Sequence, residues 1–163
     1  MNAIDLLKQQ HREVDALFQK FEKAGDGARK TRSAICRDVS DRLAMHAEIE
    51  ERIFYPATKD ARTEDLLREA VEEHLSAKRI IADLVEQEPE AEELSAKMSV
   101  LREQVKHHVE EEEKELFPKV RKALDADLLE QLGDQMTELM EELQAKGDAR
   151  LEVPNQTDAP ARI

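Results

Sequence analysis

Histidines in this sequence fall where a helix would otherwise place core hydrophobic residues. In each of four long stretches, apolar side chains recur every three or four residues, the spacing of one helix face. His11, His46, His74 and His108 each occupy one of these apolar positions. A single core histidine is more often a hydrogen-bonded structural residue than a ligand, but four of the chain's five histidines share this pattern. Because neutral imidazole is the commonest metal ligand, the pattern predicts a metal site inside a helical core.

Two glutamates share these faces. Glu50 follows His46 by one helical turn, and Glu112 follows His108 in the same way. Residues at positions i and i+4 lie about 6 Å apart at Cβ, so both side chains can bind one ion. A carboxylate without a partner in an apolar core costs several kcal/mol, whereas a bound cation keeps it ionised. We therefore expect the histidines and glutamates to hold cations together.

The arrangement occurs twice in the chain. Two segments share one spacing of histidine, glutamate and proline: His46, Glu50 and Pro56, and His108, Glu112 and Pro118. Each segment follows a stretch with one histidine on its apolar face. Two such helix hairpins facing each other would form a two-fold symmetric site, which predicts two metal ions with Glu50 and Glu112 between them. Imidazole and carboxylate ligands suit iron, manganese and zinc alike.

Other polar residues near these positions have less specific explanations. His107 points about 100° away from His108 on an ideal helix, which predicts a residue at the surface or beside a ligand and makes ligation by His107 the less favoured alternative. Lys78 lies one turn after His74, and we expect its ammonium group to extend outward or to pair with an acid. The periodicity does not assign Tyr55 to a face. The neighbouring glutamates are expected to face solvent: Glu48, Glu51, Glu111 and Glu113. Of these, Glu111 is a possible further ligand.

The composition indicates which elements position these residues. Charged residues make up 39% of the 163 residues and aromatic residues 3%, with four glycines and no tryptophan. A β-rich domain would normally contain more β-branched and aromatic residues and more turn glycines. Helix-forming residues dominate instead, so we expect a single all-α domain.

Capping residues and helix-breaking residues indicate where the helices begin and end. The predicted helices run from Asn2 to Gly25, from about 28 to 59, from Thr63 to the Glu88–Pro89 break, from about 90 to 124, and from about 127 to 146. Asn2 and Thr63 are expected to act as N-caps, and Pro56 to kink or stop the second helix. Short connections favour an up-down-up-down four-helix bundle over residues 1–124. Residues 125–146 would form an accessory helix packed outside the bundle or against another subunit, and residues 147–163 a disordered tail.

The net charge of −13 argues against nucleic-acid partners and anionic membranes, because no basic stripe is present to meet phosphates. No apolar run approaches the length that a membrane span requires. Cys36 is the single cysteine, so a disulfide framework is excluded and a reducing compartment fits best. The N-terminus lacks the pattern of a signal peptide. These features predict a soluble, cytoplasmic protein.

With His46-x-x-x-Glu50 and His108-x-x-x-Glu112 preceded by His11 and His74, the sequence resembles the hemerythrin family, specifically the bacterial HHE cation-binding domains. The resemblance covers about residues 1–124 and includes the segment HHVEEEEKELFPKV. It implies a left-handed four-helix bundle around a non-haem di-iron site. By position, His11 and His46 would hold one iron and His74 and His108 the other. Glu50 and Glu112 would bridge them together with an oxo or hydroxo group.

The chain departs from oxygen-carrying hemerythrins at two positions. Carriers have a second histidine one turn after the third-helix histidine, where this chain has Lys78. They also place the fourth-helix carboxylate one residue later, where this chain has Glu113. Both irons could then have an open position, unlike the single open iron of the carriers. The partners implied are small ligands such as O2, hydrogen peroxide or nitric oxide.

Three functions follow as hypotheses. The first is a di-iron protein that binds O2 or senses oxygen or iron, because no acid/base or substrate residues stand out beyond the ligands. The alternative is a di-iron oxidoreductase that decomposes hydrogen peroxide or handles nitric oxide, for which the Lys78 replacement leaves room. The third is a structural bundle without metal. The sequence leaves open whether the protein is an enzyme, and it does not reveal the oligomeric state.

Overall fold

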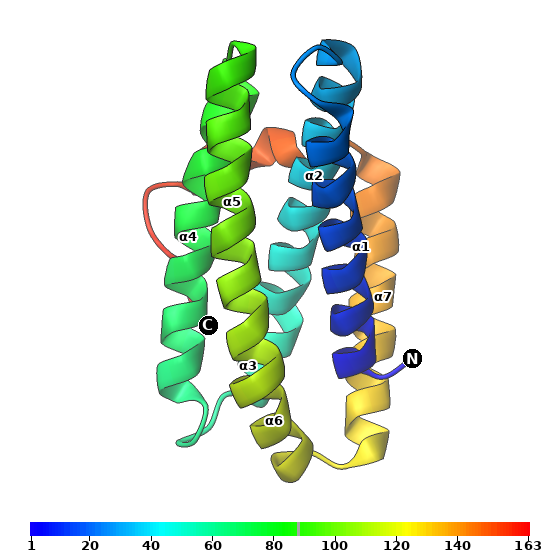
Figure 1. Cartoon of the computed structure of the whole chain (residues 1–163). Coiled ribbons are helices and arrows are strands. Elements are labelled where there is room, and N and C mark those ends of the chain that lie inside the picture. Colours follow the sequence, from blue (N-terminus) through cyan, green and yellow to red (C-terminus); the bar gives the residue numbers. More distant parts are fainter. Residues whose placement is uncertain (88) are drawn as a thin grey trace.

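The computed structural model describes residues 1–87 and 89–163 of the chain. Four long helices form an up-down-up-down bundle (Figure 1): α1 (Ala3–Ala24), α2 (Arg29–Ile49), α4 (Glu64–Glu86) and α5 (Ala91–Glu111). Helix α1 packs against α2 and α5, and α4 packs against α5 and α2, so the four helices enclose a central lumen. The described residues contain helices, turns and loops but no strand. The expected all-α four-helix bundle is confirmed.

Two of these helices continue through a widened turn. Helix α2 passes through the π-helical turn η1 (Glu50–Phe54) into α3 (Tyr55–Thr58), and α5 passes through η2 (Glu112–Leu116) into α6 (Phe117–Ala123). The N–H of Tyr55 donates to the carbonyl of Glu50, and that of Phe117 to the carbonyl of Glu112. The next residue in each case is a proline, which has no N–H for an ordinary helical bond. The helix therefore widens just before Pro56 and ends two residues after it, at Thr58. π-Turns of this kind are frequent at functional sites.

Local capping accounts for the helix ends. Asn2 caps α1, because its Oδ1 accepts a hydrogen bond of 2.9 Å from the N–H of Asp5. Thr63 precedes α4 as expected, but its hydroxyl donates to the carbonyl of Thr58 instead of capping the helix. Helix α4 ends before the predicted Glu88–Pro89 break, of which Glu88 lies outside the described residues.

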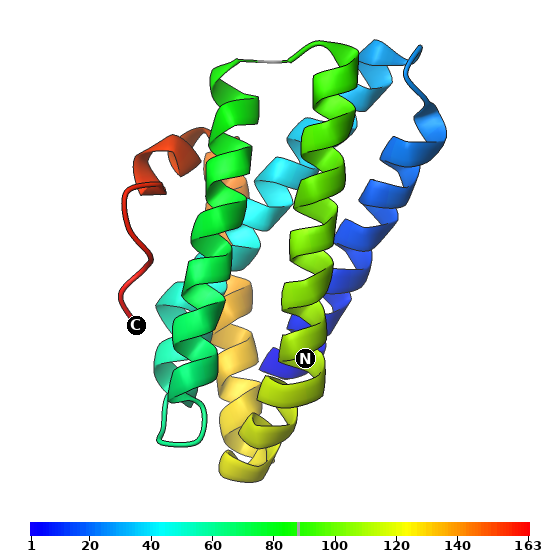
Figure 2. The ribbon, with the colours of Figure 1, turned by 60° about the vertical axis from the view of Figure 1, so that its left-hand side comes forward.

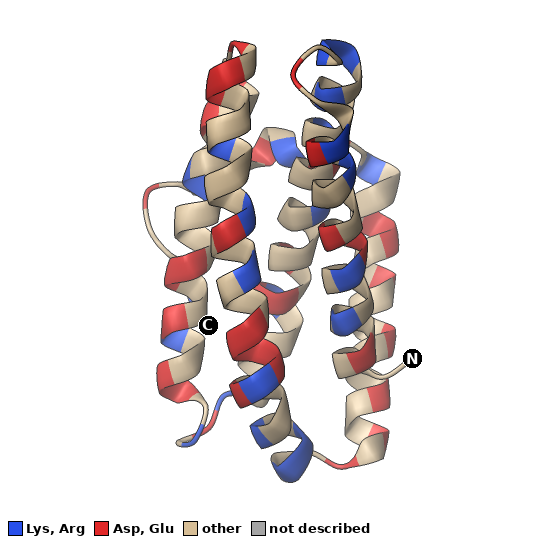
Figure 3. Cartoon of the chain, in the orientation of Figure 1, with Lys and Arg blue, Asp and Glu red and all other residues tan. Residues whose placement is uncertain are grey.

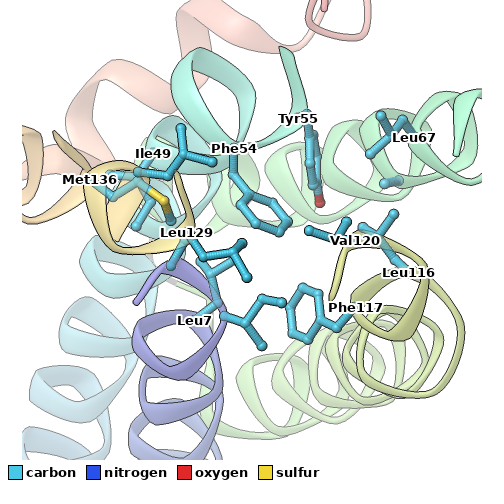
Figure 4. Close-up of a cluster of buried hydrophobic side chains, with 14 of the residues drawn as sticks. Leu7, Ile49, Phe54, Tyr55, Leu67, Leu116, Phe117, Val120, Leu129 and Met136 are labelled. Carbon is cyan, nitrogen blue, oxygen red and sulfur yellow. The ribbon is translucent and has the colours of Figure 1, made fainter. Parts of the chain in front are cut away.

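Two apolar clusters fill the lumen and leave a polar layer between them. One cluster lies at the end of the bundle that contains the N-terminus and includes Leu7 and Phe54 (Figure 4). The other lies toward the opposite end and includes Phe18 and Met98. His11 lies on α1 between the parts of the helix that contribute to the two clusters. Water is thus displaced from both sides of the histidine layer.

Helix α7 (Ala126–Lys146) packs outside the bundle against α1 and α2 (Figures 1 and 2). Its buried face contains Leu129, Leu132, Met136 and Leu139, whereas Leu128 is 39% exposed. Gly133 lies so close to the N-terminus that a Cβ there would collide with the backbone of Met1 and Asn2. This glycine allows α7 to approach the start of α1.

The C-terminal residues differ from the expected disordered tail. Residues Ala149–Gln156 form the 3-10 helix η3, which packs on α2 and α4, and the chain then runs along α4 (Figure 2). Arg150 pairs with both carboxylate oxygens of Asp41 at 3.2 and 3.0 Å, and Val153 is 1% exposed. An ion pair and one buried apolar residue anchor this segment, although its sequence shows no periodicity.

Acidic and basic residues are distributed along all the helices, with acidic residues concentrated near the end of α5 (Figure 3). Within residues 1–87 and 89–163, no helix has both the length and the apolar character needed to cross a membrane.

Candidate metal centre

One histidine from each bundle helix lies at the same level of the lumen. His11 belongs to α1, His46 to α2, His74 to α4 and His108 to α5, and all four are 6–7% exposed. Their rings form two edge-to-face pairs. The centroids of His11 and His46 are 5.0 Å apart, and those of His74 and His108 are 4.8 Å apart. The structure thus brings the four predicted histidines together.

Each imidazole directs Nδ1 to an acceptor at the edge of the lumen. The acceptors are Gln10 for His46 (2.6 Å), Glu73 for His108 (2.9 Å), Glu113 for His11 (2.8 Å) and Glu51 for His74 (2.8 Å). An ionised carboxylate or an amide oxygen can only accept, so Nδ1 carries the proton. Nε2 then presents its lone pair to the lumen, which is the usual orientation of a metal-ligating histidine.

The two predicted glutamates lie between the histidine pairs. Glu50 is 0% exposed; its Oε1 lies 3.2 Å from Nε2 of His46 and its Oε2 lies 3.0 Å from Nε2 of His74. Glu112 is 2% exposed, and its Oε1 lies 3.4 Å from Nε2 of His11 and 3.1 Å from Nε2 of His108. Each carboxylate therefore contacts one histidine of each pair and lies between the two pairs.

Four atoms of this layer are buried without a hydrogen-bond partner among the described residues: His11 Nε2, His46 Nε2, Glu50 Oε1 and Glu112 Oε1. These side chains form a group whose ligand atoms all lie within 4.8 Å of one another. An unsatisfied buried polar atom costs about 1–3 kcal/mol, so four together would be unfavourable. Two imidazole lone pairs and two carboxylate oxygens are, however, a suitable ligand set for a divalent cation. The residues therefore fit a metal ion.

A second group of potential ligands consists of Glu50, His74 and His108, so Glu50 is common to both groups. The hydroxyl of Tyr55 enters this second group. It lies 3.0 Å from Oε2 of Glu50 and 3.0 Å from Oε2 of Glu112, and it also contacts Nε2 of His74 at 3.2 Å. Tyr55 is the residue of the site that the helical periodicity missed.

Charge compensation is evident in the pKa values of the layer. Burial by itself would raise the pKa of Glu50, but the surrounding His46, His108 and His74 hold that pKa well below its usual range. In the same way burial would lower the pKa of His108, while Glu112 raises it well above its usual value. Without a metal, the charged forms of His108 and Glu50 stabilise each other in the layer. A bound cation can supply the same balance.

Lys78 and Glu51 form a buried ion pair beside His74. Nζ of Lys78 lies 2.7 and 3.0 Å from the two carboxylate oxygens of Glu51, and the side chains are 8% and 10% exposed. Burial would raise the pKa of Glu51, but His74 and Lys78 lower it overall. The expectation that Glu51 faces solvent is therefore wrong, whereas Lys78 does pair with an acid.

The remaining candidates lie outside this layer. The side chain of His107 is 64% exposed, and its Nε2 lies 3.1 Å from Glu111 and 3.5 Å from Glu73 at the surface. Glu113 is 34% exposed in its side chain and holds Nδ1 of His11, so it supports a ligand histidine. Glu48 is 31% exposed and pairs with Arg52 on the outer face.

A small cavity of about 50 Å³ adjoins the four histidines. Its other walls are largely apolar and include Val14, Leu43 and Ile81, with Lys78 among the polar residues. One water molecule needs roughly 10–15 Å³ measured in this way, so the cavity can hold a molecule of two or three heavy atoms.

Comparisons with known proteins agree with this geometry. The chain is 29% identical over 131 residues to a DNA nickase of Nostoc sp. (strain PCC 7120); the match covers 80% of this chain but only 37% of that protein. The crystal structure of a hemerythrin HHE cation-binding-domain protein from Mycobacterium kansasii superposes with a TM-score of 0.78 at 22% identity, covering 94% of this chain and 99% of that one. The family model described as hemerythrin HHE cation binding domain matches residues 2–120. With this match and the buried His/Glu cluster, the chain is a metal-binding helical bundle that belongs to the hemerythrin HHE cation-binding domain family.

Proposed function

We propose that this protein holds two iron ions at the buried layer and uses them to bind O2 or to sense oxygen or iron. The ligands would be His11 and His46 for one ion and His74 and His108 for the other, with Glu50 and Glu112 bridging. The observation that carries the proposal is the convergence of four buried, unsatisfied ligand atoms in one layer. Tyr55 would be a further ligand of the second ion, since its hydroxyl contacts three of the same side chains and Glu112 as well.

One feature supports two ions, and the ligand types are compatible with a redox metal. The two ligand groups share Glu50, and a shared carboxylate joins neighbouring ions instead of serving one. The donors are imidazole nitrogens and carboxylate oxygens, which suit iron and also manganese or zinc. Iron would supply one-electron chemistry and affinity for O2, which the side chains of the site do not provide by themselves.

The cavity favours a small ligand. Its volume of about 50 Å³ and its apolar walls suit O2 or another molecule of two or three heavy atoms. The chain's own residues would orient such a ligand against the histidine layer and exclude bulk water, because apolar clusters close the lumen on both sides.

A second candidate is a di-iron oxidoreductase that decomposes hydrogen peroxide or handles nitric oxide. The observation that favours it is a proton donor on either side of the layer. Lys78 lines the cavity, and the hydroxyl of Tyr55 lies 3.0 Å from both bridging carboxylates. Proton delivery is needed to release water from a peroxide but not to bind O2 reversibly.

Two measurements on iron-loaded protein separate these candidates. Oxygen-dependent absorbance that is stable and reversible, without turnover, supports binding or sensing. Steady-state consumption of hydrogen peroxide that His74→Ala abolishes supports the enzyme. His107→Ala is the matched control, because this histidine is exposed outside the layer and its loss should change neither result.

We do not extend the nicking activity named for the Nostoc relative to this chain. The match covers 37% of that protein, and the cavity here is too small for a phosphodiester between two nucleosides. The net charge of −13 likewise disfavours a polyanionic substrate. We propose a cytoplasmic location, which a single cysteine in 163 residues supports.

A further inference from the structure

We infer that the two metal positions are unequal, the His74/His108 position holding its ion at least about tenfold more tightly than the His11/His46 position. The inference rests on the proposed two-ion site and concerns residues other than the four histidines and the two bridging glutamates. Partners that hydrogen-bond to the far nitrogen of a ligand histidine typically change metal affinity by about 10–100-fold. In this chain those partners differ systematically between the two halves of the bundle.

The first difference concerns the acceptors on α1 and α4. Gln10 and Glu73 each directly precede a ligand histidine in the sequence, so they occupy equivalent places in the two halves. Gln10 accepts from Nδ1 of His46 at 2.6 Å, and Glu73 accepts from Nδ1 of His108 at 2.9 Å. Gln10 is a neutral amide, whereas Glu73 can be an anion. A carboxylate withdraws the imidazole proton more strongly, which makes Nε2 of His108 the better donor.

The second difference concerns the acceptors after the bridging glutamates. Glu51 accepts from Nδ1 of His74, and Glu113 accepts from Nδ1 of His11 at the same distance of 2.8 Å. The side chain of Glu51 is 10% exposed and is fixed by Lys78, whereas that of Glu113 is 34% exposed. Lys78 offsets part of the charge of Glu51 but holds its carboxylate against His74, whereas solvent screens Glu113 and competes for its oxygens. We therefore expect Glu51 to support His74 more strongly than Glu113 supports His11.

The third difference is the aromatic residue beside each pair. Tyr55 directs a hydroxyl to His74 and His108 at 3.2 and 3.4 Å. Phe117, the equivalent residue, stacks on His11 with a centroid separation of 6.1 Å and has no ligand atom to offer. All three differences strengthen the His74/His108 position, which leaves the His11/His46 position as the exchangeable one.

The test is an anaerobic titration of metal-free protein with Co²⁺, followed by its d–d absorption and by metal analysis. Glu50 and Glu112 are shared, so two phases in the wild-type curve alone would not assign them to positions. Variants that lack a histidine of one metal position show which phase belongs to which position. His46→Ala should keep one ion at the affinity of the tighter phase, and His108→Ala should keep one ion about tenfold more weakly or worse.

Two near-isosteric exchanges test the cause without deleting a ligand. Gln10→Glu should tighten the weaker phase, and Glu73→Gln should loosen the tighter phase, each by about tenfold or more. Binding of fewer than two Co²⁺ ions by the wild-type protein would contradict the proposed two-ion site itself. If the wild-type protein binds two ions, equal or reversed affinities in His46→Ala and His108→Ala would overturn the inference. Unchanged phases in both Gln10→Glu and Glu73→Gln would overturn it as well, and either result would leave the two-ion site intact.

Discussion

Tyr55 and Phe117 occupy equivalent places in the two halves of the bundle, each directly after a π-turn and directly before a proline, but only Tyr55 brings a hydroxyl to the site. The ring of Tyr55 stacks near His74 with centroids 5.5 Å apart, and that of Phe117 stacks on His11 at 6.1 Å. Their ring positions are similar, while their chemistry differs. The internal symmetry of the ligands therefore does not extend to this pair.

Replacement of this hydroxyl should change the spectrum of the iron-loaded protein. Burial, together with Glu112 and Glu50, raises the pKa of Tyr55 well above its usual value, so the phenol keeps its proton in the absence of metal. A bound ferric ion would displace that proton. We expect a visible phenolate-to-iron band in the wild-type protein that Tyr55→Phe removes. The variant Phe117→Tyr should retain the band, and a band that survives in Tyr55→Phe would contradict the assignment.

Stability should depend on pH in opposite ways with and without metal. In the metal-free protein the pKa of His108 is raised above its ordinary 6.5, and the pKa of Glu50 is lowered below its ordinary 4.5. The histidine contribution is fully present below pH 6.5 and is lost as pH rises through the raised pKa. The carboxylate contribution is present above pH 4.5 and is lost as pH falls through the lowered pKa.

The metal-free protein should therefore be most stable between about pH 4.5 and 6.5 and should lose stability toward pH 8. Metal-loaded protein should behave differently, because metal needs deprotonated imidazoles and binds more tightly as pH rises. Urea unfolding at pH 6 and pH 8 measures the free energy of unfolding of the metal-free and the metal-loaded protein. A metal-free protein that is more stable at pH 8 than at pH 6 would argue against the charge balance described for the layer.

Sequence periodicity was sufficient for the six central residues, because His11 and its counterparts lie on regular helix faces that the bundle turns inward. The repeat also indicated the two-fold arrangement of Glu50 and Glu112. Periodicity failed after these glutamates, since the π-turns change the number of residues per turn. Glu51 was consequently expected in solvent, and Tyr55 had no assigned face. Comparison of the two repeats offered a signal for Tyr55, because Phe117 has the same spacing.

Long-range contacts account for the other differences. Helix α7 packs against the N-terminus at Gly133, a contact that helical periodicity within α7 does not register. The C-terminal segment is ordered through the ion pair of Arg150 with Asp41, a partner more than a hundred residues away. Local sequence carries no information about such a partner.

Gly133→Ala should destabilise the protein although it improves helix propensity. Alanine gains about 1 kcal/mol over glycine inside a helix. The added Cβ would meet the backbone of Met1 and Asn2, which cannot move without displacing the start of α1. Overpacking of this kind costs about 1–3 kcal/mol, so a net loss is expected in thermal or urea unfolding. A Gly133→Ala protein more stable than the wild type would disprove the close contact.

Lys78→Met should destabilise the bundle and disturb His74. The substitution removes the ammonium group that holds Glu51 and leaves the carboxylate largely buried. Breaking a buried ion pair from one side costs roughly 3–5 kcal/mol. Lys114→Met is the control, because that lysine is 74% exposed and pairs only loosely with Glu110. Equal unfolding free energies for the two variants would show that the Lys78–Glu51 pair contributes little.

The central claim is that two iron ions bind in the buried histidine layer with Glu50 and Glu112 between them, and iron stoichiometry measures it most directly. Protein loaded anaerobically with ferrous iron, freed of excess metal and then oxidised should contain two irons per chain and show the near-ultraviolet absorption of an oxo-bridged pair. The double variant Glu50→Gln/Glu112→Gln should lose both irons and the absorption, while His107→Ala keeps both. One iron per chain, or two irons retained without both bridging carboxylates, would contradict the account.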